Sequence, residues 1–278
     1  AAGMVHAPGV ADALAARIAE AAGFDVALYV SGGAVARSFG VPDVGLVGAG
    51  EMVRRVAEIR AVTGAALVVD ADTGYGGPLA AARAVAALER AGAAAVHLED
   101  QAEPKRCAQY GGVRLADARE AAARIRAAAA ARAGDLAVIA RTDALPVAGL
   151  AEAVARLRRY ADAGADMAFA EGVRTADDIA ALAEAVPLPL VLQSGDLERA
   201  GIGPEEAARA GCRLLLHPAD LQRAAIRAMA HTAAALRRDG TGAAARDLLA
   251  SDEEREGAVG RSDYAAFEAW AHGADAGP

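Results

Sequence analysis

Short apolar runs of strand length alternate with longer alanine-rich amphipathic stretches along almost the whole chain. Eight of the short runs are predicted to be strands: Met4–His6, Asp25–Val30, Ala66–Asp70, Ala94–Leu98, Ala137–Arg141, Met167–Ala170, Leu188–Gln193 and Arg213–His217. A helical pattern follows each of them: Val10–Ala22, Ala49–Val62, Leu79–Ala91, Asp117–Ala131, Leu150–Ala163, Ala176–Ala185, Pro204–Ala210 and Ala219–Arg238. The sequence therefore repeats a strand-helix unit eight times.

Strands that are joined by helices pair in parallel, and eight such units can close into a (β/α)8 barrel. The length of 278 residues suits one large α/β barrel or two ordinary domains. An open doubly wound sheet is the alternative, but no Gly-x-Gly-x-x-Gly turn follows the first predicted strand. We therefore predict an α/β protein whose residues 1–238 form a (β/α)8 TIM barrel.

The pattern changes after Arg238 to a predicted turn and two shorter helical stretches, Ala243–Leu249 and Tyr264–His272. We expect residues 239–278 to form a C-terminal helical extension. The second stretch places Tyr264, Phe267 and Trp270 on a similar face. An aromatic stripe outside a complete barrel needs a surface to cover it, and the two candidates are its own barrel and a neighbouring subunit.

Composition restricts the class of partner. The formal net charge of −8 argues against nucleic acid and anionic membranes, since both need clustered Lys and Arg on the protein. Arg and Glu interrupt the longest alanine-rich stretches, so none supplies the run of about 20 apolar residues that a membrane span requires. Cys107 and Cys212 lie far apart, as expected of reduced thiols in the cytoplasm. The expected partner is a small molecule or another protein.

Acidic residues gather directly after predicted strands, where barrel enzymes place their chemistry. Asp70 and Asp72 are two apart on an extended segment and share a face, and Glu99 comes from the adjacent strand. Such oxygen ligands suit Mg2+, or Mn2+ in its place. The alternative is that the aspartates cap a loop. Burying several carboxylates without a cation would raise their pKa values and cost stability, which favours the metal.

Other polar residues at the same rim have two interpretations each. The segment Ser31-Gly32-Gly33 is either an ordinary loop or a cradle whose backbone N–H groups bind an anionic substrate group. His97 is either a core histidine or a partner of the waters around the metal. Later strands contribute three more side chains: Arg141, Glu171 and Gln193.

A long loop from Pro104 to Gly112 follows the fourth predicted strand and has the length of a lid. Its thiol, Cys107, stands between Lys105 and Arg106 on one side and Ala108 on the other. The two cations are expected to lower the pKa of this thiol and to make it an acid, a base or a nucleophile. The alternative is an incidental cysteine.

Six segments with distinctive residues occur in one order along the chain: Tyr29–Gly33, Phe39–Gly45, Asp70–Gly76, His97–Gln101, Lys105–Cys107 and Ala140–Asp143. In this combination the sequence resembles the isocitrate lyase and phosphoenolpyruvate mutase superfamily over nearly its whole length. The resemblance implies a (β/α)8 barrel whose Mg2+ is held by Asp72 with help from Asp70 and Glu99, with Asp43 near the waters of the metal. It also implies a homotetramer, commonly with a C-terminal helix exchanged between subunits.

The same resemblance assigns roles around the substrate. Four residues are expected to grip a substrate carboxylate: Ser31, Gly32, Gly33 and Arg141. Tyr29 is expected close to the reacting centre. The segment Lys105-Arg106-Cys107 is similar to that of the methylisocitrate lyase branch, where the cysteine is the acid that protonates the departing enolate, and it also occurs in carboxyphosphonoenolpyruvate phosphonomutase. The phosphoenolpyruvate mutases proper lack this cysteine.

Two departures from the lyase pattern concern substrate recognition. Ala108 and Gln109 stand where the lyases usually have Gly-His, although Gln109 can still donate a hydrogen bond. The segment Gln193–Glu198 replaces an Asn followed by a Glu-Gly-Gly-like stretch. We assign eight residues to the substrate site: Gln109, Gln193, His97 and Glu171, together with Ser31, Gly32, Gly33 and Arg141. Tyr29, Lys105, Arg106 and Cys107 form the predicted catalytic group.

The predicted function is Mg2+-dependent cleavage of a carbon–carbon bond in a small 2-hydroxy or 2-oxo di- or tricarboxylate, through an enolate. Phosphonomutase and oxaloacetate decarboxylase or hydrolase chemistry are the alternatives on the same platform. A barrel that has lost activity and serves as a binding protein is the alternative from another class.

Overall fold

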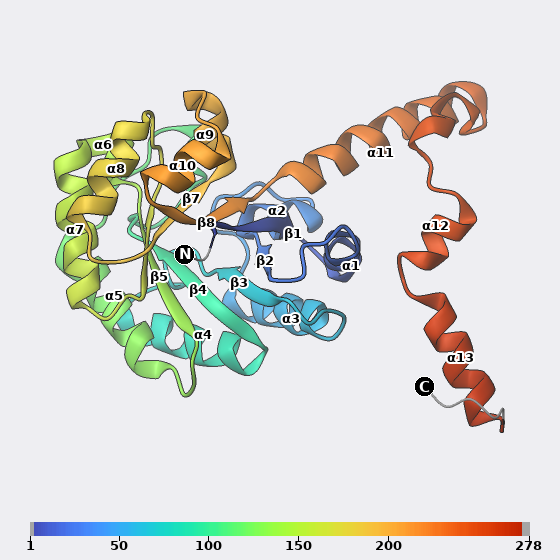
Figure 1. Ribbon diagram of the computed structural model, residues 1–278, viewed down its shortest axis with the longest axis horizontal. Coiled ribbons are helices and arrows are strands. Elements are labelled where there is room, and N and C mark those ends of the chain that lie inside the picture. Colours follow the sequence, from blue (N-terminus) through green and yellow to red (C-terminus); the bar gives the residue numbers. More distant parts are fainter. Residues whose placement is uncertain (1–2, 274–278) are drawn as a thin grey trace.

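The computed structural model describes residues 3–273, and these form the predicted barrel with added C-terminal helices (Figure 1). Eight parallel strands close in sequential order. The strands are β1 (Val5–Val10), β2 (Ala27–Val30), β3 (Ala66–Asp70), β4 (Ala93–Glu99), β5 (Ala137–Thr142), β6 (Met167–Ala170), β7 (Leu190–Gln193) and β8 (Cys212–His217).

Helices cover the outside of the sheet and connect its strands (Figure 1). They are α1 (Ala13–Ala21), α2 (Gly32–Ser38), α3 (Ala49–Arg60), α4 (Pro78–Arg90), α5 (Ala118–Ala131), α6 (Ala144–Ala148), α7 (Leu150–Asp162), α8 (Ala176–Ala185), α9 (Ser194–Ala200), α10 (Pro204–Ala210) and α11 (Asp220–Asp239). A 3-10 turn, η1 (Ala108–Tyr110), lies between β4 and α5.

The apolar strands are buried because both of their faces are covered. One cluster of side chains fills the barrel interior and includes Tyr29, Ile139 and Phe169. A second cluster packs the outer face of the sheet against the helices. Gly211 shows how tightly the helix-to-strand connections fit, since its φ is +128° and an added Cβ would lie 2.4 Å from the Ala183 Cβ.

The register of the sheet places the polar strand ends at one level. Asp70 at the end of β3 pairs with His97 on β4, and Glu99 at the end of β4 pairs with Arg141 on β5. Because the strands are parallel, their carboxyl ends meet at the same rim of the barrel. The fold therefore gathers the residues that the sequence singles out.

The structure contains short helices that the sequence analysis does not predict. α2, α6 and α9 each follow directly on a strand and have five to seven residues. Such lengths are too short to show a clear helical period. Strand β1 also extends to Val10, beyond the predicted end at His6, because Pro8 and Gly9 lie within it and obscure its strand pattern.

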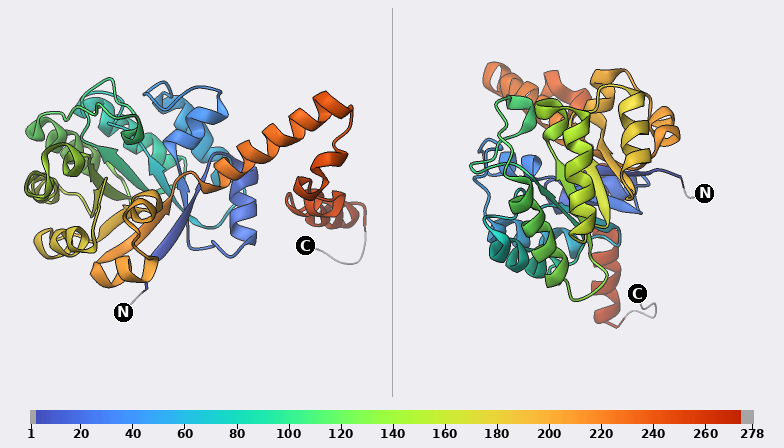
Figure 2. Two further views of the ribbon diagram at one scale, coloured as in Figure 1. Left: turned by 90° about the horizontal axis from the view of Figure 1, so that it is seen from above. Right: turned by 90° about the vertical axis from the view of Figure 1, so that its left-hand side faces the viewer.

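The C-terminal segment leaves the barrel (Figures 1 and 2). α11 projects outward and leads to η2 (Ala243–Leu248), α12 (Asp252–Gly257) and α13 (Arg261–Ala271). The aromatic stripe on α13 stays exposed, with Tyr264 at 68%, Phe267 at 53% and Trp270 at 44%. The barrel of the same chain therefore does not cover this stripe.

Among residues 3–273, every helix is too short or too polar to cross a lipid bilayer.

Candidate active site

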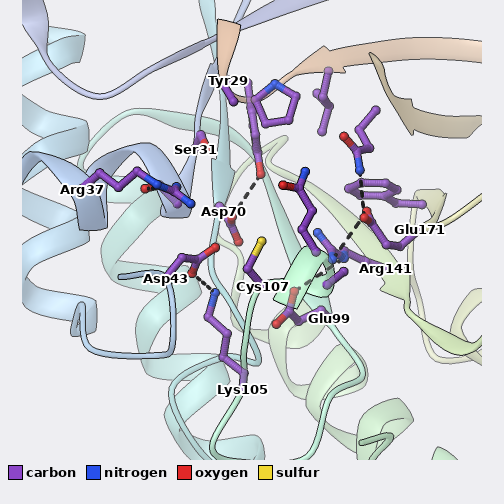
Figure 3. Close-up of a pocket in the computed structure, with 18 residues that line it drawn as sticks. Tyr29, Ser31, Arg37, Asp43, Asp70, Glu99, Lys105, Cys107, Arg141 and Glu171 are labelled. Carbon is purple, nitrogen blue, oxygen red and sulfur yellow. Dashed lines mark hydrogen bonds and ion pairs between the residues drawn. The ribbon is translucent and has the colours of Figure 1, made fainter. Parts of the chain in front are cut away.

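A cavity of about 100 Å³ lies at the carboxyl ends of the strands (Figure 3). Most of the predicted site residues line it: Tyr29, Ser31, Gly33, Asp43, Asp70, Glu99, Lys105, Cys107, Gln109, Arg141, Glu171 and Gln193. The other four do not line it: Gly32, Asp72, His97 and Arg106, of which Arg106 is exposed to solvent. The structure thus brings side chains from six strands or their following loops into one small space.

The predicted metal ligands are buried, with Asp70, Asp72 and Glu99 between 5% and 8% exposed. The Lys105 ammonium lies 2.5 Å from Asp43 Oδ1 and 2.5 Å from Asp72 Oδ1. Within residues 3–273, no three acidic, histidine or cysteine side chains are already arranged as the ligands of a metal ion. Asp43 and Asp72 thus meet around an ammonium group rather than in a preformed cation site.

Protonation differs among these carboxyl groups. Burial, followed by the charge of Asp70, raises the pKa of Asp72 to about 7. Burial also raises the pKa of Glu99 well above its usual range, although Arg141 and Lys105 oppose this. Burial disfavours the charged form of Asp70 as well, but His97, which is charged in the acidic range where Asp70 titrates, outweighs it together with Lys105, Arg141 and the Asp72 N–H. The pKa of Asp70 is therefore lowered to about 2. This site holds more carboxyl groups than its cations neutralise.

Tyr29, Asp70 and His97 form a buried hydrogen-bonded group. The Tyr29 hydroxyl donates to Asp70 Oδ2 at 3.0 Å and lies 2.8 Å from His97 Nε2. Burial lowers the pKa of His97 to about 4, so the ring is neutral at pH 7. Because the single phenol hydrogen goes to Asp70, we assign the ring proton to Nε2, where it is donated to the Tyr29 oxygen. From its place on β4, His97 therefore orients Tyr29.

Arg141 is the principal cation of the opposite wall. Its Nη2 lies 2.8 Å from Asp143 Oδ1 and 3.5 Å from Glu171 Oε2, and its Nε lies 3.5 Å from Glu99 Oε2. The guanidinium also lies over the Phe169 ring, 5.0 Å from the centroid. These contacts fix the planar group at the cavity, where it can bind a carboxylate through two N–H groups.

Asp100 supports this wall, and the sequence analysis assigns it no role. Its carboxylate accepts hydrogen bonds from Thr142 Oγ1 at 2.6 Å, Tyr160 Oη at 2.8 Å and the Asp143 N–H at 3.0 Å, and it pairs with Arg156 at 3.1 Å. Asp100 thereby holds the segment that carries the partner of Arg141. Its position directly after Glu99 is the one sequence signal for this role.

Cys107 lines the cavity from the long loop, and its N–H donates to the Asp43 carbonyl at 3.1 Å. The expectation that its neighbours lower the pKa of the thiol is wrong. Burial raises this pKa. The two neighbouring cations do not offset the effect of burial, since the Lys105 ammonium turns toward Asp43 and Asp72 and the Arg106 side chain is exposed. The thiol therefore keeps its proton at neutral pH and is suited to donate it.

The segment Ser31-Gly32-Gly33 is the start of α2 and not an ordinary loop. Ser31 caps the helix by accepting the Ala34 N–H at 3.3 Å. The Gly32 N–H donates to Asp70 Oδ2 at 3.1 Å, and an added Cβ at Gly32 would lie 2.7 Å from the same oxygen. Glycine is thus required at this position for the close approach to Asp70.

Arg37 also lines the cavity, and the sequence analysis does not identify it. Its Nη1 donates to the Gly33 carbonyl at 2.8 Å, and its Nη2 lies 3.3 Å from Tyr110 Oη on the long loop. No sequence signal indicated this contact, because it joins the Arg37 side chain to a backbone carbonyl of a helix that the sequence pattern does not show.

Glu171 and Gln193 form the far end of the cavity (Figure 3 labels Glu171). Gln193 Nε2 donates to Glu171 Oε1 at 2.8 Å and to Asp196 Oδ1 at 3.2 Å. Burial raises the pKa of Glu171 to about 7, with Arg141 opposing the shift. Glu171 is therefore partly protonated near neutral pH.

This raised pKa predicts a pH dependence of stability. Folded Glu171 binds its proton more tightly than unfolded Glu171 does, so its contribution to the free energy of unfolding is complete below about pH 4.5 and is lost as the pH rises to about 7. Between pH 5 and 8 we expect the free energy of unfolding of wild type to fall by about 1–3 kcal/mol relative to that of Glu171→Gln. Urea unfolding of both proteins across this range measures it, and parallel curves would contradict the assignment.

The chain matches the model of the phosphoenolpyruvate phosphomutase family over residues 1–237. It is 40% identical over 221 residues to "Probable 2-methylisocitrate lyase 2" of Corynebacterium glutamicum, an alignment that covers 79% of this chain and 72% of that protein. Other curated relatives named as 2-methylisocitrate lyase or 2,3-dimethylmalate lyase share 33–36% of aligned residues.

Solved structures agree with this relationship. Oxaloacetate acetylhydrolase in complex with 3,3-difluorooxalacetate superposes with a TM-score of 0.90 and 34% identity, covering 99% of this chain and 94% of that one. Phosphonopyruvate hydrolase in complex with oxalate and Mg++ superposes with a TM-score of 0.85 and 31% identity, covering 96% and 93%. The chain belongs to the phosphoenolpyruvate phosphomutase family and is an enzyme of the isocitrate lyase and phosphoenolpyruvate mutase superfamily.

Proposed function

We propose that this enzyme is a Mg2+-dependent lyase that cleaves a carbon–carbon bond in a small 2-hydroxy or 2-oxo di- or tricarboxylate through an enolate. The observation that carries the proposal is the cavity in which the protonated Cys107 thiol, the Arg141 guanidinium and buried carboxyl groups face one another. A proton donor, a carboxylate-binding cation and an oxygen-rich site are the parts that cleavage to an enolate needs.

The residues present fit a divalent cation of the Mg2+ class. All of the candidate donors are carboxylate oxygens: Asp72, Asp70, Glu99 and Asp43. Glu99 Oε1 is buried and has no hydrogen-bond partner among the described residues, and the pKa of Asp72 is raised to about 7. Both features indicate carboxyl groups that a cation would stabilise in the charged form. When bound, Mg2+, or Mn2+ in its place, supplies positive charge that polarises the substrate oxygen.

The protein's own residues account for the other steps. Arg141 binds a substrate carboxylate, and the Ser31 and Gly33 end of α2 lies on the same cavity. The Tyr29 hydroxyl, which donates its hydrogen bond to Asp70, lies beside the reacting centre. For a 2-hydroxy acid, the hydroxyl proton passes to a carboxylate of the cavity as the hydroxyl carbon becomes a carbonyl. The electron pair of the broken carbon–carbon bond stays on the departing fragment as an enolate. The Cys107 Sγ–H transfers its proton to the enolate carbon, and the resulting thiolate takes a proton from solvent after the product leaves. The long loop around Cys107 excludes water from this carbon.

A panel of candidate acids, incubated with Mg2+ and assayed for pyruvate, glyoxylate or oxaloacetate, tests this function. We expect release of one 2-oxo acid product from at least one 2-hydroxy or 2-oxo di- or tricarboxylate, and loss of the reaction when EDTA removes the metal. An active preparation that cleaves carbon–phosphorus bonds and none of these acids would contradict the lyase assignment.

Hydrolase or phosphonomutase chemistry is the second candidate. It is favoured by the similarity to oxaloacetate acetylhydrolase and to phosphonopyruvate hydrolase, at 34% and 31% identity. Profiling with oxaloacetate and phosphonates separates it from lyase activity. A barrel that has lost lyase activity need not bind Mg2+ together with oxalate, so a titration with both ligands distinguishes that alternative.

We further propose that the enzyme is a homo-oligomer, a tetramer in which α13 packs on a neighbouring subunit. The exposed aromatic stripe of α13 and the outward course of α11 support this proposal (Figure 2). Sedimentation equilibrium is expected to give a tetramer, and a monomer at micromolar concentration would contradict it.

A further inference from the structure

A second cavity opens beside the active site, near the carboxyl ends of β6 and β7. Its volume is about 640 Å³. Ala108, Gln109 and Glu171 line both this cavity and the active-site cavity, so the two spaces share a wall. We call it the Arg174 cavity, after one of the two arginines that line it.

The two cavities differ in the size of the ligand that they can hold. Sites for small-molecule ligands usually have volumes of about 300–1,000 Å³. The Arg174 cavity lies within this range, whereas the active-site cavity of about 100 Å³ lies below it. A substrate longer than the reacting fragment therefore finds room across the wall formed by Gln109 and Glu171.

The charge of the Arg174 cavity favours an anionic group. Arg174 is exposed and takes part in no ion pair within residues 3–273. Arg199 pairs with Asp196, whose buried carboxylate also accepts the Gly172 N–H at 2.6 Å. The charge of Asp196 is thus already compensated, which leaves Arg174 as an available cation.

Other parts of the same cavity are apolar or weakly charged. Pro146, Val173 and Ala200 contribute apolar surface along which a carbon chain can lie. Glu171 on the shared wall has a pKa raised to about 7, so its negative charge is incomplete at neutral pH. A carboxylate that lies near Arg174 therefore meets limited repulsion from this side.

We propose that the Arg174 cavity binds a second carboxylate of the substrate, carried on a carbon chain that passes the wall of Gln109 and Glu171. This inference rests on the proposed function, because it describes the far end of the same substrate. It selects 2-oxo or 2-hydroxy acids whose further carboxylate stands several carbon atoms from the reacting end. Arg174 is then a specificity-determining residue, and Arg199 pairs with Asp196 on the wall of the same cavity.

Calorimetric titration in the presence of Mg2+ tests this with a matched pair of ligands. 2-Oxoadipate and 2-oxohexanoate have the same carbon chain and differ in the distal carboxylate. Wild type is expected to bind the diacid about tenfold more tightly, the value of one charge-assisted hydrogen bond. Arg174→Ala is expected to reduce this preference to about threefold or less, and Arg174→Lys to retain part of it.

Two further measurements complete the test. Oxalate, which lacks the distal chain, should bind wild type and Arg174→Ala with affinities equal within about twofold. Arg126→Ala removes an exposed arginine of α5 and should leave the diacid preference unchanged. Oxalate binding without any preference for the diacid, or an equal loss of both ligands in Arg174→Ala, would overturn this inference alone. Failure of wild type to bind oxalate with Mg2+ would overturn the proposed function and this inference together.

Discussion

Cys107→Ser is expected to lower turnover by about 10²–10⁴-fold, because a positioned general acid contributes a factor of that size. Serine keeps the shape of the side chain, but its hydroxyl is a much weaker acid than the thiol. The raised pKa of Cys107 keeps the thiol protonated at neutral pH, so wild type always has this proton available. Steady-state rates with the substrate found in the acid panel measure the effect.

Two measurements separate this role from damage to the site. Mg2+ affinity should stay within about twofold of wild type, since Cys107 is not among the carboxylate donors. Cys212→Ala removes the other thiol, which is buried in β8 away from the cavity, and should leave turnover nearly unchanged. Loss of metal affinity in Cys107→Ser would show that the thiol is misassigned, and full turnover would exclude it as the acid.

Asp72→Ala is expected to abolish metal-dependent activity, a loss of roughly 10³-fold or more. A metal that polarises the substrate oxygen lowers the barrier by several kcal/mol, and each 1.36 kcal/mol is a factor of about ten in rate. The variant also removes one of the two carboxylates that hold the Lys105 ammonium. Mg2+ titration and turnover, measured on the same preparation, should both show the loss.

Asp72→Asn and Asp135→Ala provide the controls. The amide keeps the shape of Asp72 but lacks its charge, so it should lose Mg2+ affinity while the protein stays folded. Asp135 is exposed on the loop before β5, and its replacement should change neither property. Undiminished turnover in Asp72→Ala would defeat this model of the metal site.

Much of the barrel can be predicted from the sequence. The bounds of β3, β6, α8 and α10 are the predicted ones, because buried parallel strands are continuously apolar and their helices have a clear period. The short helix α2 cannot be found in this way. It begins with two glycines, and its start is fixed by the hydrogen bond from Gly32 to Asp70, a contact between distant parts of the chain.

Which residues gather at one rim of the barrel was easier to predict than the interactions among them. Side chains that follow parallel strands must meet at one rim, and this places Asp70, Glu99 and Arg141 together. Their partners depend on the direction in which each side chain turns. Lys105 lies near Cys107 in sequence, but its ammonium turns to Asp43 and Asp72. Proximity along the chain therefore predicted the wrong direction for the pKa shift of the thiol.

A calorimetric titration of oxalate into wild-type protein, with Mg2+ and after its removal by EDTA, tests whether the carboxyl groups of the cavity form a metal-dependent site. We expect binding of one oxalate per chain with Mg2+ and a loss of affinity of at least about a hundredfold without it. Oxalate binding of equal strength in both conditions, or no binding in either, would contradict a metal-dependent site among these carboxylates.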